Sequence, residues 1–208
     1  MTQAQMIYAL LGQKGGGGKS TTAYGLATIL AGAGQKVLIA DLDFDQYTCA
    51  LWKSIRPEGR TAFDVIECRT LADVGKHSAG YDVIIIDGAP HASKLSLEAA
   101  ECAHRVIITT GNTIADLQPS VRLARNLVTE GIERERIVFA VCKSPSEAET
   151  KTARETIESY GFSAAPAGLR FSAGYGKAGD KGLSVTETPF VSLRVEAKAY
   201  INQLILEA

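Results

Sequence analysis

Short runs of apolar residues alternate along this chain with longer segments in which apolar residues recur at helical spacing. The apolar runs that predict strands are residues 5–11, 36–41, 82–87, 104–110 and 136–142. Val65 and Ile66 predict a short additional strand. Because successive residues of each run are apolar, both faces of each strand should be buried, as in a parallel sheet.

Three segments between or after these runs have a helical period. The first has apolar residues at i, i+3, i+4 and i+7 within 23–30 and ends at Gly32 and Gly34, and the others are 116–130 and 147–160. Strands that alternate with helices predict an α/β fold with a doubly wound, mostly parallel sheet and helices on both faces. No repeat or linker interrupts the pattern, so we expect a single domain over the whole of residues 1–208.

Composition limits the classes of function. Hydrophobic residues make up 46% of the chain and charged residues 22%, which is typical of a compact globular domain. Lys and Arg total 22 against 23 Asp and Glu, so the net charge of -1 gives no overall attraction to nucleic acid or anionic lipid. Any site for a polyanion must therefore be local.

The expected compartment is the cytoplasm. The four cysteines are too far apart in sequence to predict a zinc site or a disulfide framework, and Cys142, at the end of an apolar run, is expected to pack as a small hydrophobic residue. Residues 1–5 lack the basic start and apolar run of a signal peptide, and no run of 18 apolar residues predicts a membrane span.

A glycine-rich loop joins the first predicted strand to the first predicted helix. Its sequence is Lys14-Gly15-Gly16-Gly17-Gly18-Lys19-Ser20-Thr21. Four successive glycines let backbone N–H groups surround a phosphate, and a helix that begins near Lys19 directs its positive dipole end there. Lys19 supplies a charge for the outer phosphates, Ser20 can ligate Mg²⁺ through its hydroxyl, and Thr21 can donate to a phosphate oxygen.

This loop departs from the standard G-x-x-x-x-G-K-[ST] pattern. Gln13 occupies the first glycine position, and a second lysine, Lys14, opens the loop. The segment 14–21 matches the Lys-Gly-Gly-x-Gly-Lys-[Ser/Thr] pattern of deviant Walker A ATPases. The chain thus resembles the ParA/MinD family, and within it the small ParA-type, ParF-like partition ATPases. The resemblance implies that Lys14 reaches across a nucleotide-sandwich dimer to the phosphates bound by the other subunit.

Acidic residues lie at the ends of the predicted strands 36–41 and 82–87. The segment Asp41-Leu42-Asp43-Phe44-Asp45-Gln46 resembles the Asp-x-Asp-Pro-Gln switch of this family, with Phe44 and Asp45 in place of Pro and Gln. We expect Asp43 to orient the attacking water and contact Mg²⁺ through water, and Asp41 to support it through the metal's water shell. Asp87, the last residue of the predicted strand 82–87, resembles a Walker B residue that holds Mg²⁺ through water.

The identity of the base is argued from an absence. Guanine-binding relatives of this fold carry Thr-Lys-x-Asp after a late strand, where the carboxylate accepts from guanine N–H groups. The equivalent stretch here is Cys142-Lys143-Ser144-Pro145, which lacks that carboxylate and favours ATP. Lys143 and the Thr188-Pro189 segment are candidates for lining the base, with a helix-capping turn and an ordinary loop as the alternatives.

A local excess of basic residues lies late in the chain. The candidates for contacting DNA phosphates are Arg170, Lys177, Lys181, Lys151 and Arg154. Doubled in a dimer, these charges would give sequence-independent binding that weakens with salt. Taken singly, each residue is equally well explained as a solvated surface charge, so the resemblance carries this prediction.

The resemblance implies a Mg²⁺-dependent ATPase, slow unless stimulated, that forms an ATP-bound homodimer, binds DNA non-specifically and associates with the nucleoid. It would position a plasmid, a chromosome or another cargo together with a small centromere-binding or cargo-adaptor protein. One alternative is a MinD-like membrane switch, but 191–208 offers only two basic residues against two acidic ones. Another is an ATP-dependent metabolic enzyme that resembles dethiobiotin synthetase.

Overall fold

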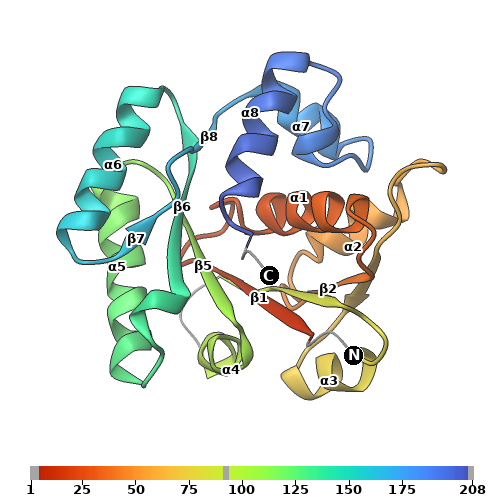
Figure 1. The fold of residues 1–208 in the computed structure, drawn as a ribbon, viewed down its shortest axis with the longest axis horizontal. Coiled ribbons are helices and arrows are strands. Elements are labelled where there is room, and N and C mark those ends of the chain that lie inside the picture. Colours follow the sequence, from red (N-terminus) through yellow and green to blue (C-terminus); the bar gives the residue numbers. More distant parts are fainter. Residues whose placement is uncertain (1–4, 91–93, 206–208) are drawn as a thin grey trace.

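A computed structural model of the chain describes residues 5–90 and 94–205, whose strands form an eight-stranded sheet (Figure 1). The sheet order is β3-β2-β4-β1-β5-β6-β7, with β8 paired to β6, and every pair of strands is parallel. The strands are β1 (Met6–Leu11), β2 (Val37–Asp41), β3 (Asp64–Glu67), β4 (Val83–Asp87), β5 (Arg105–Thr110), β6 (Ile137–Ser144), β7 (Ser163–Ala164) and β8 (Leu169–Arg170).

Helices cover both faces of this sheet (Figure 1). One face carries α1 (Lys19–Gly32), α2 (Thr48–Ser54), α7 (Ala173–Gly179) and α8 (Val191–Asn202). The other carries α3 (Leu71–His77), α4 (Lys94–Cys102), α5 (Ile114–Thr129) and α6 (Glu147–Ser159). Short 3-10 helices span Arg134–Arg136 (η1) and Val185–Glu187 (η2). The predicted doubly wound α/β fold is confirmed.

The central strands are buried on both faces, as their unbroken apolar runs predict. Alternate residues of β1 enter two separate cores: Tyr8 and Leu10 pack with α1 and α8, whereas Ala9 and Leu11 pack with α4 and α5. The five main predicted strands all form, to within two residues at either end. The short strand predicted at 65–66 forms as β3, at an edge of the sheet.

The C-terminal segment lies against α1. Tyr200 and Ile201 of α8 are fully buried, and a Cβ on Gly25 of α1 would lie 2.7 Å from Ile201 Cδ1, so glycine permits this close approach. Val191 and Val195, near the start of α8, are each 63% exposed. The apolar residues of α8 that face α1 therefore pack on the body of the protein, and 206–208 lie outside the described residues. Within 5–90 and 94–205, no helix has both the length and the apolar character needed to cross a membrane.

Candidate nucleotide-binding site

The carboxyl ends of three adjacent parallel strands bring the glycine loop and the acidic residues together. β4 lies between β1 and β2, and Asp41 of β2 is in register with Asp87 of β4. The loop leaves β1 at the same edge, and the Gly88 N–H, just past β4, donates to the Leu10 carbonyl. This edge is where open α/β sheets place their ligands.

Glycine is required by the backbone of the loop at two positions. Gly16 has φ 70° and Gly18 has φ 98°, a left-handed region that L-residues rarely adopt. A Cβ on Gly18 would also lie 2.8 Å from Cys142 Sγ, because β6 passes directly behind the loop. The first helical residue of α1 is Lys19, so its N-terminal N–H groups lie at the end of the loop.

The two lysines of the loop have different environments. Lys19 is buried, with only 4% of its surface exposed, whereas the Lys14 side chain is 52% exposed. Lys14 Nζ forms an ion pair with Asp116 Oδ1 of α5 at 2.7 Å. Burial alone would favour the neutral acid, but the Lys14 ammonium and the Thr113 hydroxyl outweigh it and lower the pKa of Asp116. Ser20 and Thr21 are half-buried in the first turn of α1.

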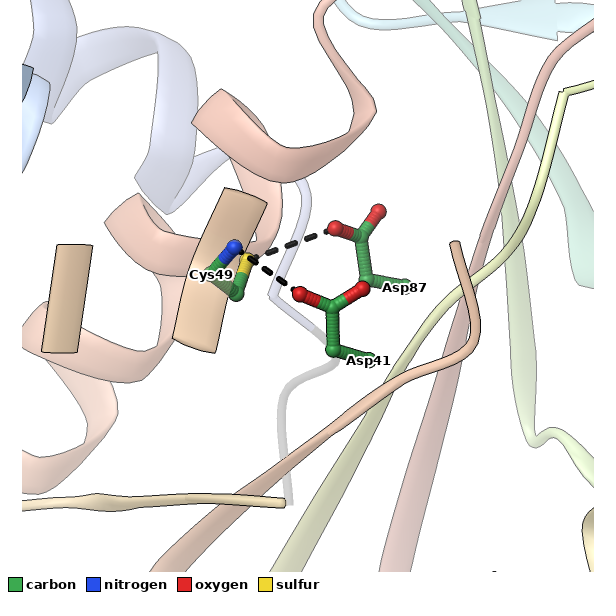
Figure 2. Close-up of side chains that lie close together, drawn as sticks. All are labelled: Asp41, Cys49 and Asp87. Atoms are coloured by element: carbon green, nitrogen blue, oxygen red, sulfur yellow. Dashed lines mark hydrogen bonds between the residues drawn. The ribbon is translucent and has the colours of Figure 1, made fainter. Parts of the chain in front are cut away.

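Behind the loop, Asp41, Asp87 and Cys49 form a fully buried cluster (Figure 2). Their ligand-type atoms all lie within 4.8 Å of one another. The Cys49 thiol donates to Asp87 Oδ2 at 3.3 Å, and the Cys49 N–H donates to Asp41 Oδ2 at 2.9 Å. Asp87 Oδ1 is buried and accepts no hydrogen bond from the described part of the chain. Sequence analysis did not assign Cys49 to the site, because no motif or ligand spacing marks it.

Burial raises the pKa of both carboxyls in this cluster. The pKa of Asp87 rises to about 7, because burial and the Asp41 charge outweigh the Ser20 hydroxyl and the Lys19 charge. The pKa of Asp41 rises to about 6, because burial exceeds the effect of the N–H groups of Ala50, Asp43 and Cys49 that donate to it. Two raised carboxyl pKa values beside a buried lysine are typical of a functional site.

Asp43 lies two residues after Asp41, in the turn that leads from β2 to α2. Its side chain is 6% exposed, and its backbone N–H donates to Asp41 Oδ1 at 3.2 Å. The Asp43 carbonyl accepts from the N–H groups of Gln46 and Tyr47, which folds the loop that leads into α2. Phe44 at the tip of the turn is 54% exposed. The structure therefore places Asp41 as the anchor of the turn that carries Asp43.

Two hollows flank the glycine loop. One, of about 310 Å³, is lined by loop residues 13–17, the segment after β5 and Asp116. The other, of about 330 Å³ and mostly apolar, begins at Gly18 and Thr21 and extends past Lys143 to the segment 169–173 and α7. Lys143, with φ 58°, borders both hollows.

The Thr188-Pro189 segment, the other candidate for lining the base, lines neither of these two hollows, and its contact with the base stays a prediction. Thr188 is fully buried, and its hydroxyl donates to the Gly174 carbonyl. Pro189 lies instead in a separate hollow with Phe190. Tyr175 of α7 is 8% exposed and lines the apolar hollow beside Gly18.

The predicted basic patch is divided between two surfaces. Lys177 and Lys181 line a hollow of about 650 Å³ together with Arg60 and Arg194, which sequence analysis did not assign. Three other candidates pair with acids: Arg170 with Glu196, Lys151 with Glu155, and Arg154 with Glu158. These three border a different hollow, where Glu147 and Glu196 reduce the positive charge.

Comparison with known proteins gives one family and several relatives. The family model for the CobQ/CobB/MinD/ParA nucleotide binding domain matches residues 8–184. The "Maintenance of carboxysome distribution protein A" of Gloeobacter kilaueensis is 27% identical over 188 residues, with coverage of 87% of this chain and 84% of the relative. The "Chromosome-partitioning ATPase Soj" of Thermus thermophilus is 28% identical over 170 residues, with coverage of 58% and 68%. A Cyanothece McdA variant in complex with ATP has a similar fold, with TM-score 0.71, 16% identity and 98% coverage of both chains.

Proposed function

Because this chain belongs to the family of CobQ/CobB/MinD/ParA nucleotide-binding domains, we propose that it is a Mg²⁺-dependent ATPase of the ParA type. In this proposal a single domain binds ATP, forms an ATP-bound homodimer and hydrolyses ATP slowly until a partner protein stimulates it. The observation that carries the proposal is the buried Lys19 at the start of α1, beside the buried Asp87 and next to Ser20.

ATP would occupy the glycine loop and the hollows on its two sides. The phosphates would lie on the N–H groups of residues 15–21, with Lys19 neutralising their charge. The apolar hollow that begins at Gly18 has the size and lining expected for a base and ribose, with Lys143 at its edge. In support, a protein of similar fold is solved as an ATP complex.

The residues behind the loop fit a magnesium ion. Asp87 Oδ1 has no hydrogen-bond donor within the described chain, so it can accept a hydrogen bond from a water bound to the metal. The Ser20 hydroxyl near Asp87 can bind the metal directly. Magnesium would neutralise charge that develops on the phosphates during transfer. Asp43 would orient the attacking water and contact the metal through water, and Asp41, which accepts three N–H groups, would hold that turn in place.

Dimer formation is supported by the exposed residues around the loop. The Lys14 side chain is 52% exposed and pairs with Asp116 of α5, and this position on the surface suits a contact with a partner's phosphates. Phe44 and Ile114 are exposed by 54% and 59%, on the turn before α2 and at the start of α5. Apolar side chains exposed beside a charged site are typical of an interface.

The proposed role is to position cargo on DNA. One relative carries the name of a carboxysome-distribution protein and another that of a chromosome-partitioning ATPase. We infer that the ATP-bound dimer binds non-specific DNA through Lys177 and Lys181, joined by Arg60 and Arg194. It would act in the cytoplasm on the nucleoid, and a small adaptor protein would link it to a plasmid, a chromosome or another cargo.

The first experiment measures nucleotide binding and oligomeric state together. Wild type should bind ATP with Mg²⁺ and become dimeric. Lys19→Ala should abolish nucleotide binding, Lys14→Ala should keep binding but lose the dimer, and Asp43→Ala should keep an ATP-bound dimer that does not hydrolyse. An Asp43→Ala protein that hydrolyses ATP at the wild-type rate would remove Asp43 from the mechanism.

The second experiment measures DNA binding with ATP at two salt concentrations. Lys177→Ala combined with Lys181→Ala should weaken binding and reduce its salt dependence, because these residues contact phosphates in the proposal. The matched control combines Lys151→Ala with Arg154→Ala, whose side chains pair with acids. Unchanged binding in the Lys177→Ala, Lys181→Ala variant would place the site elsewhere, and an equal loss in the control would show that the site is not confined to Lys177 and Lys181. No DNA binding by a normal ATP-dependent dimer would favour a MinD-like membrane switch, and turnover that needs a small cosubstrate would favour a metabolic enzyme.

A further inference from the structure

The buried cluster behind the phosphate loop contains a thiol, which the proposed magnesium chemistry does not use. We propose that Asp41, Cys49 and Asp87 form a binding site for a thiophilic divalent cation such as Zn²⁺ or Cd²⁺, with Cys49 Sγ as a direct ligand. Occupation of this site blocks the magnesium position beside Ser20. The binding step stands on the cluster alone, whereas the block on magnesium rests on the proposed ATPase function.

The spacing of the three groups suits a tetrahedral ion. Zinc bonds of about 2.3 Å to sulfur and about 2.0 Å to oxygen place the two ligand atoms about 3.5 Å apart at a tetrahedral angle. Cys49 Sγ lies 3.3 Å from Asp87 Oδ2, and all three ligand atoms lie within 4.8 Å of one another. Three protein ligands leave a fourth position for water, as in open zinc sites.

A second observation points to a cation, and it is independent of the spacing. Asp87 is fully buried, and its Oδ1 accepts no hydrogen bond within the described chain, although a buried carboxylate oxygen ordinarily has a donor. The two Asp41 oxygens accept backbone N–H groups but keep further lone pairs, because each carboxylate oxygen has two. Both carboxylates can therefore ligate an ion without a change in the backbone.

The charges also balance when a soft cation binds. The thiol must lose its proton, so binding follows Cys49–SH + M²⁺ → Cys49–S–M⁺ + H⁺, with the proton released to water. A dication with one thiolate and two carboxylates leaves one negative charge, which the neighbouring Lys19 ammonium offsets. Sulfur is a soft ligand, whereas Mg²⁺ prefers oxygen ligands, so a direct bond to Cys49 Sγ favours a thiophilic ion over Mg²⁺.

Thiolate binding to Cd²⁺ has a direct optical signature. The test titrates nucleotide-free protein with CdCl₂ and follows the thiolate-to-cadmium absorption band in the ultraviolet. The background is Cys102→Ser, because Cys102 is the exposed cysteine among the described residues. The band should appear and saturate at one Cd²⁺ per chain. In the Cys49→Ser, Cys102→Ser double variant the band should vanish and the Kd for Cd²⁺ should rise at least about tenfold.

The outcomes separate this site from the ATPase proposal. An equal band in the double variant, or no band in Cys102→Ser, overturns the cation site. If Cys49→Ser does not fold, Asp87→Asn in the Cys102→Ser background takes its place. This variant should still show the thiolate-to-cadmium band, but its Kd for Cd²⁺ should rise at least about tenfold. An unchanged Kd overturns the site. Magnesium-dependent ATP binding, measured on Cys102→Ser without Cd²⁺, tests the proposed function alone. Preloaded Cd²⁺ should then weaken that binding in Cys102→Ser more than in the double variant, and equal weakening overturns the block on magnesium.

Discussion

Replacing Gly18 by alanine tests the geometry of the phosphate loop most directly. Gly18 has φ 98°, and an L-residue in this region costs roughly 1–2 kcal/mol. The new methyl would also lie 2.8 Å from Cys142 Sγ and 3.0 Å from Cys142 Cβ, and overpacking of this kind costs about 1–3 kcal/mol. Gly18→Ala should therefore lower the free energy of unfolding by about 2–5 kcal/mol. This is a large share of the total, because the free energy of unfolding of a typical domain is about 5–15 kcal/mol.

A second glycine separates the cost of backbone strain from the cost of overpacking. Gly34, just after α1, has φ 91°, but nothing lies within 4 Å of the position that its Cβ would occupy. Gly34→Ala should lower the free energy of unfolding by about 1 kcal/mol, from backbone strain alone. Both variants are compared by urea denaturation monitored by circular dichroism, with the slope m checked for constancy.

Removing the sulfur tests the clash itself. In a Cys142→Ala background, Gly18→Ala should cost about 1–2 kcal/mol less than in wild type, because the nearest atom is gone. Equal costs in the two backgrounds would refute the proposed contact between the loop and β6. A Gly18→Ala cost no larger than that of Gly34→Ala would refute the reasoning as a whole.

Three further predictions concern charged side chains. Burial and a neighbouring carboxylate raise the pKa of Asp87 to about 7, so the nucleotide-free protein should lose stability as pH rises from about 4 to about 7, where only the native state keeps the proton. Asp87→Asn should flatten that part of the thermal-unfolding profile, and an unchanged slope contradicts the assignment. Arg56 and Glu187 form a nearly buried ion pair, so Arg56→Ala should cost about 3–5 kcal/mol in urea denaturation, and a loss below about 1 kcal/mol would show that the pair is dispensable. The exposed pair of Lys14 with Asp116 should contribute at most about 1 kcal/mol, so a larger loss in Asp116→Asn denaturation would show that Asp116 does more than hold this lysine.

The sheet could be predicted because its signal is local. The apolar runs at 36–41 and 82–87 are continuous, since their strands lie between helical layers and are buried on both faces. The helix that begins at Lys19 also has local start and stop signals, with glycines before it and Gly32 at its end. In each case a few neighbouring residues are enough to specify the element.

Short elements held by distant contacts could not be predicted. α2 (Thr48–Ser54) has an exposed Leu51 at its middle and is followed by an exposed Ile55, so it shows no amphipathic pattern. Its start is fixed by Asp41, which accepts the N–H groups of Cys49 and Ala50. Similarly, β7 and β8 have two residues each and exist only because β6 offers them a free edge.

By itself the sequence determined the five main strands, the helices α1, α5 and α6, the place of the glycine loop between β1 and α1, and the acids at the ends of β2 and β4. These features follow from local spacing and from the rule that parallel strands end at one edge. Only the tertiary structure decided that Lys14 pairs with Asp116, that Cys49 joins the two acids, and that the basic residues divide between two surfaces. The physical reason is that side-chain partners far apart in the chain meet through packing, which no local pattern records.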